Sequence, residues 1–306
     1  MNIEPILQSQ LYGFEREFND LVNLFNSNKL PNKILLSGPK GSGKCTFAYH
    51  LMNYVLSLKE DFSYALDDLK INIENKSHKL FINKTSPNFF SIDVSKEKKS
   101  VDINQIRILI NNLNKSSLNS KPRFVLIDNI EFLNVSSVNA LLKIIEEPNN
   151  NVFFILIANN KRILPTLKSR CLIFKLSLSF KKSIEITNKI IDGNIFELLN
   201  DDYINHYSTP GYMINLLHYS QTHNIDLFNL RLKDFIEFLI KDNHFKKSNL
   251  ANEILYNLIQ FFLRTKLSSI NFDYYQVFLR KINITRTYNL DEESLLMEFQ
   301  RNYLNA

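Results

Sequence analysis

The sequence predicts a domain of the α/β class with a parallel sheet, followed by a region built only from helices. In the first 175 residues, short apolar runs rich in β-branched and aromatic side chains alternate with stretches in which apolar residues recur at helical spacing. A chain that alternates strands and helices in this way forms a parallel sheet covered by helices on both faces. From Tyr212 to Ala306 the chain contains neither glycine nor proline, and its apolar residues again recur at helical spacing.

Each predicted element follows from a local pattern. Short apolar runs predict strands at 34–36, 89–94, 124–127, 152–158 and 172–174. Amphipathic stretches predict helices between them, at 46–56, 103–113 and 135–146. We expect an α/β domain at 1–175, a short helical segment at 176–218 and a helical C-terminal domain at 219–306.

Composition limits the classes of protein to consider. With 306 residues, 44% apolar and 22% charged, the chain should be globular with two or three domains. The net charge of +6 permits an anionic partner such as DNA, although a Lys- and Asn-rich chain acquires it equally well from biased base composition. Cys45 and Cys171 belong to no CxxC pair, which excludes a disulfide framework and a cysteine zinc module. With no signal-peptide pattern and no apolar run of roughly 18–20 residues, we expect a cytoplasmic protein without membrane contact.

A glycine-rich turn follows the first predicted strand. Residues 37–46 read SGPKGSGKCT, which contains the GxxxxGK pattern of a phosphate-binding loop between a strand and a helix. In such a loop the backbone N–H groups and the helix N-terminus point at a phosphate, and the lysine neutralises its charge. The residues predicted to form this nucleotide site are Gly38, Gly41, Gly43, Lys44, Cys45 and Thr46.

The position after the lysine departs from the pattern. The motif requires Ser or Thr there, because the hydroxyl binds Mg²⁺, but this chain has Cys45. Mg²⁺ prefers oxygen ligands, so a thiol is a poor replacement. Thr46 cannot take over, because one step along a helix turns the side chain by about 100°. We therefore expect no metal site and no required cofactor, and the sequence leaves open whether ATP or ADP still binds passively.

The third predicted strand ends in an acidic residue, Asp128, which is the position of the carboxylate near the metal in nucleotide sites of this kind. A hydrolysing enzyme of this type has a glutamate next, which orients the attacking water. This chain has Asn129 there, and an amide cannot accept a proton. Glu131, two residues further on, is expected on the surface.

Two longer segments resemble a known family. Residues 139–148, NALLKIIEEP, resemble the NALLKxLEEP signature of bacterial clamp-loader subunits, and residues 164–171, LPTLKSRC, are similar to their LPTIxSRC box. Residues 11–14 and 30–33 also resemble segments that precede the phosphate loop in this family. The similarity covers roughly residues 10–215 in order, and the C-terminal domain carries no matching motif.

The resemblance implies an AAA+ fold in which residues 176–218 form a small helical lid and 219–306 a collar that joins subunits into a five-membered ring. The implied partners are the gamma/tau and delta clamp-loader subunits of DNA polymerase III and, through the complex, the sliding clamp and primed DNA. In such rings the arginine of the SRC box reaches the ATP of a neighbouring subunit, and Arg170 is the matching position. Asn159 falls at the sensor 1 position, where it contacts a γ-phosphate or caps the loop. Tyr212 stands where an active subunit has its sensor 2 arginine.

These departures favour a ring member that does not hydrolyse ATP. The metal hydroxyl, the catalytic carboxylate and the sensor 2 arginine are missing while Arg170 is kept, so we expect no intrinsic catalysis, only a contribution to the polymerase complex. The alternative is an active clamp-loader ATPase that tolerates Cys45. Many relatives carry a zinc module of four cysteines after the phosphate-loop helix, but residues 59–87 contain no cysteine, so we expect no zinc. His78 in this segment is expected on the surface.

Overall fold

The computed structural model describes residues 4–93, 103–115, 119–146, 151–159, 163, 165–265, 272–288 and 290–304. Contacts between residues divide the chain into two compact units. The first unit comprises Met1–Ile190 together with Thr209–Tyr212, and the second comprises Ile191–Ser208 together with Met213–Ala306. The division into an α/β domain, a lid and a collar stays a prediction.

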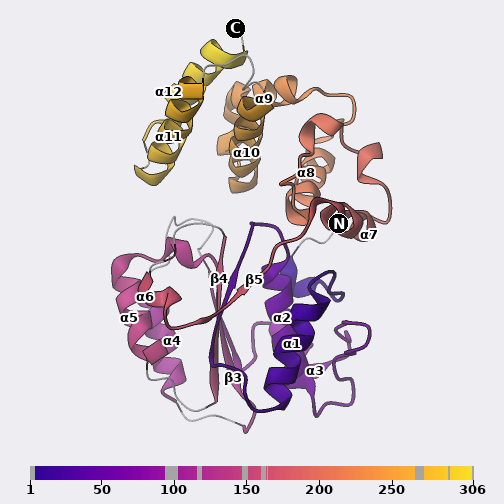
Figure 1. The fold of residues 1–306 in the computed structure, drawn as a ribbon, viewed down its shortest axis with the longest axis vertical. Helices are drawn as coiled ribbons and strands as arrows, with labels where there is room; N and C mark the ends of the chain where they lie inside the picture. The colour runs from indigo at the N-terminus through magenta and orange to yellow at the C-terminus, as the bar shows by residue number, and fades with distance from the viewer. Residues whose placement is uncertain are drawn as a thin grey trace. The chain divides into compact units, whose positions relative to one another are not determined.

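Within the described residues of the first unit, five strands form one parallel sheet (Figure 1). The strands are β1 (Lys33–Ser37), β2 (Phe89–Ile92), β3 (Arg123–Ile127), β4 (Val152–Ala158) and β5 (Leu172–Lys175). Their order is β2-β3-β4-β1-β5, and each neighbouring pair is parallel. On β1, which lies between β4 and β5, Leu35 is beside Leu156 of β4 and Ile173 of β5. The predicted α/β class with a parallel sheet is confirmed.

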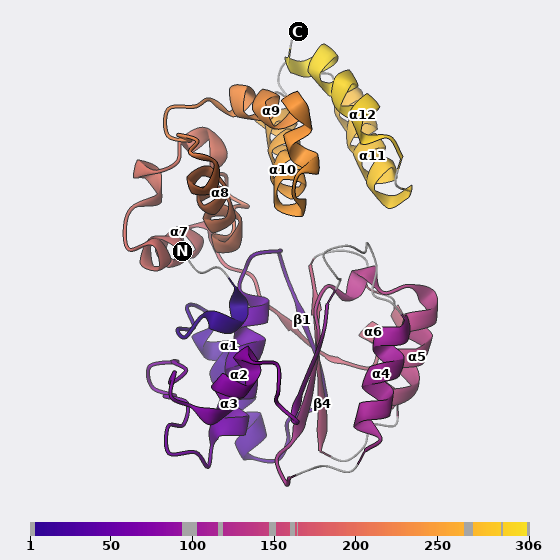
Figure 2. The ribbon, with the colours of Figure 1, turned by 180° about the vertical axis from the view of Figure 1, so that it is seen from behind.

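Helices cover both faces of this sheet (Figure 2). One face carries α1 (Glu15–Asn26), α2 (Lys44–Ser57) and α3 (Lys76–Ile82), and the other carries α4 (Ile103–Leu113), α5 (Val135–Glu146) and α6 (Pro165–Lys168). Successive strand residues point to opposite faces, so Ile34 and Leu36 pack in the core beneath α1–α3, whereas Leu35 packs beneath α4–α6. Each face of the sheet therefore has its own apolar core.

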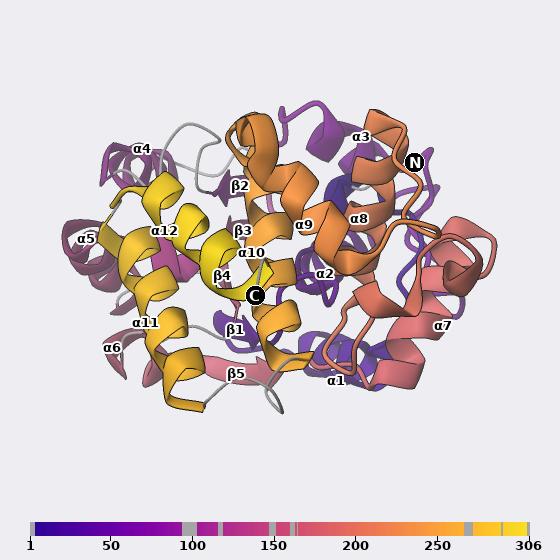
Figure 3. The ribbon, with the colours of Figure 1, turned by 90° about the horizontal axis from the view of Figure 1, so that it is seen from above.

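The described remainder of the chain is helical (Figure 3). Its helices are α7 (Phe180–Ile191), α8 (Pro210–His223), α9 (Leu232–Ile240), α10 (Asn249–Thr265), α11 (Phe272–Tyr288) and α12 (Glu292–Phe299). The aromatic side chains of the last three helices meet in the core of the second unit, where the ring of Phe299 lies 5.6 Å from that of Phe278 and 6.0 Å from that of Phe262. The predicted helical C-terminal region is confirmed. Among the described helices, none combines the length and the apolar character that crossing a bilayer requires.

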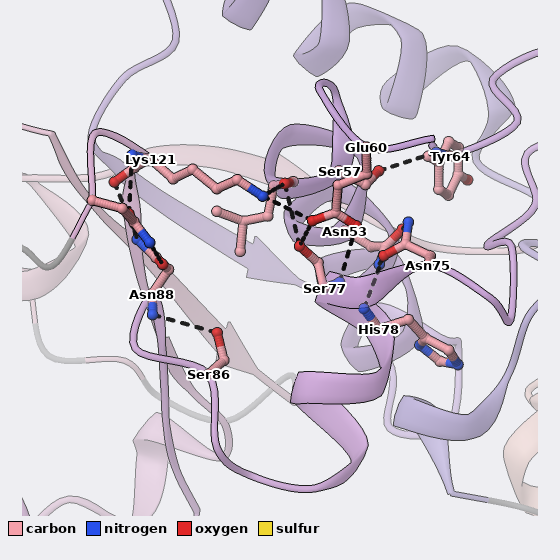
Figure 4. A network of polar contacts seen from close by, with 12 residues as sticks. Asn53, Ser57, Glu60, Tyr64, Asn75, Ser77, His78, Ser86, Asn88 and Lys121 are labelled. Atoms are coloured by element: carbon pink, nitrogen blue, oxygen red, sulfur yellow. Dashed lines mark hydrogen bonds and ion pairs between the residues drawn. The ribbon is translucent and has the colours of Figure 1, made fainter. Parts of the chain in front are cut away.

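Buried amide side chains hold the segment between α2 and β2 (Figure 4). Asn53 and Asn75 are both fully buried, and each donates a side-chain hydrogen bond to the other, at 3.3 and 3.2 Å. Asn75 also caps α3, because its Oδ1 accepts from the backbone N–H of His78 at 2.9 Å. The expectation that His78 lies on the surface is wrong: the side chain is only 4% exposed, and burial lowers its pKa.

A second polar contact ties the same segment to the strand region (Figure 4). The Glu60 carboxylate accepts from the Ser77 hydroxyl at 2.6 Å and from Lys121 Nζ at 2.8 Å. Lys121 precedes β3, so this ion pair joins the α2–α3 segment to the residues that lead into the sheet.

Candidate nucleotide-binding site and arginine finger

The predicted phosphate loop is a tight turn between the end of β1 and the start of α2. Gly38 has no room for a side chain, because a Cβ there would lie 1.9 Å from the carbonyl oxygen of Leu176. Gly41 and Gly43 have φ angles of 78° and 95°, which favour glycine. The loop therefore has the strand–glycine turn–helix geometry that a phosphate site requires.

Lys44, the first residue of α2, turns back onto the loop. Its Nζ donates to the carbonyl oxygens of Gly38 at 2.9 Å and Pro39 at 2.5 Å, and the residue is only 3% exposed. Burial lowers its pKa to about 8, while the carboxyls of Asp128 and Glu131 act in the opposite direction. The lysine thus lies in the loop with two acidic side chains close by.

Cys45 faces the acidic residue at the end of β3. Burial, followed by the nearby Asp128 and Asp93 carboxyls, raises the pKa of the Cys45 thiol well above its usual value. Burial, followed by Asp93, raises the pKa of Asp128 to about 6. Thr46 lies one residue further along α2. The structure therefore brings the predicted Cys45 and Asp128 close together.

This donor set is a poor match for the Mg²⁺ ion that such a loop normally holds with its nucleotide. A protonated thiol is a soft and neutral group, and it stands beside the carboxyl that would lie near the metal. Among the described residues, no group of three or more His, Cys, Asp or Glu side chains is arranged to hold a metal ion.

The polar residues at the ends of β3 and β4 form one network. Asn159 donates from Nδ2 to the Oδ1 of Asn129 at 2.8 Å, and Asn129 donates from its own Nδ2 to Asp93 at 2.9 Å. The backbone N–H of Asn159 donates to Glu131 Oε1 at 3.3 Å. Both amides are thus fixed by their neighbours at the carboxyl edge of the sheet.

Two members of this network were not predicted. Glu131 was expected on the surface, and that expectation is wrong: the residue is half-buried, and its Oε2 is fully enclosed without a hydrogen-bond partner among the described residues. The cause is Asn129, whose φ of 55° turns the chain back toward the end of β4. Asp93 was not predicted from the sequence as a site residue. The available signal was its position directly after the apolar run of β2, because polar residues at the carboxyl ends of parallel strands form binding sites.

The segment at the predicted sensor 2 position packs on the phosphate loop. The Thr209 hydroxyl donates to the carbonyl oxygen of Lys40 at 2.8 Å, and the Gly211 amide donates to that of Gly41 at 2.8 Å. Tyr212 follows at the start of α8, and burial raises the pKa of its hydroxyl. Tyr212, at the predicted sensor 2 position, therefore directly follows residues that contact the phosphate loop.

Arg170 lies on the surface in the turn after α6, and α6 covers the face of the sheet opposite α2 (Figure 2). Its Nη1 donates to the carbonyl oxygen of Thr166 at 2.9 Å, and its Nη2 forms an ion pair with Glu146 at 2.7 Å. The predicted finger is therefore accessible and does not lie inside its own fold. Of the boxes that contain these residues, Glu147, Pro148 and Leu164 lie outside the described residues.

A family model described as DNA polymerase III, delta subunit, matches residues 14–179, which is more than half of the chain. The chain belongs to this family. The delta-subunit family match covers the phosphate loop, both clamp-loader boxes and Arg170. It confirms the relationship to clamp-loader subunits that the boxes indicate.

Curated relatives include subunits of more than one type. The DNA polymerase III subunit delta' of Pseudomonas aeruginosa is 32% identical over 138 residues, which is 45% of this chain and 40% of the relative. The delta' subunit of Buchnera aphidicola is 27% identical over 168 residues, 55% of this chain and 49% of the relative. The gamma subunit of the same organism is 30% identical over 227 residues, 72% of this chain and 59% of the relative.

The chain thus spans less than half the length of the first two relatives. Missing catalytic groups beside a retained arginine are the pattern expected of the delta-prime type, and the delta' relatives support that assignment. Among solved structures, a gamma subunit-related protein of Thermotoga maritima is 15% identical, with a TM-score of 0.45 over 93% of this chain and 98% of that protein.

Proposed function

We propose that this chain is a clamp-loader ring member that does not hydrolyse ATP and that donates Arg170 to the nucleotide of a neighbouring subunit. The observation that carries the proposal is a contrast between two sites. At its own phosphate loop the Cys45 thiol stands beside Asp128 where a magnesium-binding hydroxyl would be needed, whereas the Arg170 guanidinium is open to the surface.

Hydrolysis at the chain's own loop would need groups that it lacks. A magnesium ion would need an oxygen ligand where Cys45 stands. An attacking water would need a carboxylate beside Asp128, but Asn129 is there, and its amide is already bonded to Asn159 and Asp93. Lys44 and the glycine turn are intact, so passive binding of ATP or ADP without turnover is compatible with this site.

Arg170 supplies what a neighbour's site needs during phosphoryl transfer. A guanidinium placed against the γ-phosphate stabilises the charge of the transition state, and in other systems such a finger accelerates hydrolysis by about 10³–10⁵-fold. The named relatives are delta', gamma and gamma/tau subunits of DNA polymerase III. The neighbours we propose are therefore gamma/tau and delta subunits, and the assembled ring would load a sliding clamp on primed DNA.

A reconstituted loader tests this proposal. In a ring assembled from this chain with gamma/tau and delta subunits, Arg170→Ala should lower the DNA-stimulated ATPase rate at least several-fold. Lys168→Ala is the matched control, because it removes a neighbouring cation from the end of α6 and should leave the rate unchanged. An unchanged ATPase rate in the ring that contains Arg170→Ala would contradict the proposed role of Arg170.

The intact loop also supports a second candidate, an active gamma/tau-like ATPase that tolerates Cys45. In that case the isolated chain would release phosphate from Mg-ATP, and Cys45→Ser would change the rate little. Release of phosphate by the purified wild-type chain, abolished in Lys44→Ala, would favour this second candidate over the first.

A further inference from the structure

Two helices that share one core hold the Arg170 side chain. Glu146 is the last residue of α5, and Arg170 follows the end of α6. Each of these two helices is held by a buried residue near its end. Ile145 is 0% and Leu167 is 1% exposed, and both belong to the core beneath α4–α6. The carboxylate and the arginine thus extend from backbone that packing holds in place.

The contacts define the orientation of the guanidinium. Glu146 Oε1 forms an ion pair with Nη2 at 2.7 Å, and the Thr166 carbonyl oxygen accepts a hydrogen bond from Nη1 at 2.9 Å. The guanidinium is planar, so contacts at two different nitrogens restrain both its position and its plane. The side chain remains partly exposed, so N–H donors of the guanidinium can still meet a phosphate.

We propose that Glu146 is a positioning residue that orients Arg170 for the nucleotide of the neighbouring subunit. This inference rests on the proposed trans role of Arg170. An unrestrained arginine side chain samples many rotamers, and it loses this conformational entropy when the guanidinium binds a phosphate in one orientation. A carboxylate that already restrains the side chain reduces that loss and raises the fraction of encounters with the correct geometry.

The pair has little to do with stability. The side chains of Arg170 and Glu146 are 36% and 49% exposed, and ion pairs at such exposure contribute little to folding. Replacing Glu146 should therefore leave the melting temperature unchanged, which separates an effect on Arg170 from an effect on the fold.

The test compares Glu146→Ala and Glu146→Gln in the reconstituted loader. Glu146→Ala removes the carboxylate and should lower kcat of the DNA-stimulated ATPase by about two- to five-fold. KM for ATP should not change, because the neighbour's own loop binds the nucleotide. Glu146→Gln keeps the size of the side chain but removes its charge, so it should lower kcat nearly as much as Glu146→Ala. Glu185→Gln, which removes another exposed paired carboxylate of the first unit, should have no effect.

The outcomes separate the two claims. If Arg170→Ala lowers the rate while Glu146→Ala matches or exceeds the wild type, the result supports Arg170 as the finger and contradicts the positioning role of Glu146. If Arg170→Ala has no effect, the proposed function itself falls. With both roles present, the double variant Arg170→Ala, Glu146→Ala should be no slower than Arg170→Ala alone, because Glu146 acts only through the arginine.

Discussion

The backbone of Gly211 lies directly against the backbone of Gly41. The Gly211 amide donates to the Gly41 carbonyl oxygen at 2.8 Å, and a Cβ on Gly211 would lie 2.7 Å from the Gly41 Cα. Two glycines distant in sequence thus meet where neither can carry a side chain. The phosphate loop and the segment that begins α8 therefore support each other.

Gly211→Ala should destabilise the first unit, because the added methyl would collide with backbone that cannot rotate away. Overpacking of this kind costs about 1–3 kcal/mol, which thermal or urea unfolding would detect. Gly193→Ala is the control, since a Cβ there meets only the Ile191 carbonyl oxygen at 3.9 Å. Equal stability of the two variants would show that the phosphate loop shifts enough to accommodate the added methyl group.

Asp128→Asn should stabilise the chain at neutral pH. The folded-state pKa of Asp128 is raised to about 6 from an ordinary 3.8, so the folded state holds this proton more tightly and is penalised once the carboxyl ionises. The penalty is absent below pH 3.8, grows as pH rises toward 6 and then stays at up to about 3 kcal/mol.

The measurement is urea unfolding of wild type and Asp128→Asn at pH 4 and pH 7.5. The stability advantage of the variant should appear at pH 7.5 and shrink toward zero at pH 4. Asn19→Ala, which changes an exposed side chain of α1 that does not titrate, should show no such pH-dependent difference. An advantage of equal size at both pH values would contradict a raised pKa.

Cys45→Ser should make nucleotide binding depend on magnesium. The hydroxyl replaces a thiol with an oxygen ligand, so ATP affinity should rise at least several-fold when Mg²⁺ is added. Hydrolysis should stay absent, because Asn129 still lacks a carboxylate. Titration of ATP with and without Mg²⁺ measures the effect, and Cys171→Ser serves as the control. Wild type and Cys45→Ser binding Mg-ATP equally well would show that the thiol is no obstacle.

Asn75→Ala should destabilise the segment between α2 and β2. The change removes the α3 cap and leaves the amide of the fully buried Asn53 without its partner. The sum of these losses is about 2–4 kcal/mol in thermal or urea unfolding. Asn72→Ala removes a more exposed bond to the Glu74 amide and should cost far less. Similar losses of stability in both variants would mean that the Asn53–Asn75 pair contributes no more to folding than an exposed hydrogen bond.

The sequence by itself determined the features that depend on neighbouring residues. The run from β1 through Gly38, Gly41 and Gly43 to Lys44 predicted a phosphate loop, and the structure has the predicted strand, turn and helix there. Alternating apolar runs and amphipathic stretches predicted the parallel sheet and its covering helices. These patterns succeed because backbone preference and burial periodicity are local properties of the chain.

Only the tertiary structure decided which distant side chains meet. Strand order places Asp93 beside Asn129, a left-handed Asn129 turns Glu131 inward, and the packing of α3 buries His78. The ion pair of Arg170 with Glu146 depends in the same way on how α5 and α6 share a core. No local pattern encodes these contacts, because they arise from the order in which strands and helices pack, and a side chain's partners follow from that order.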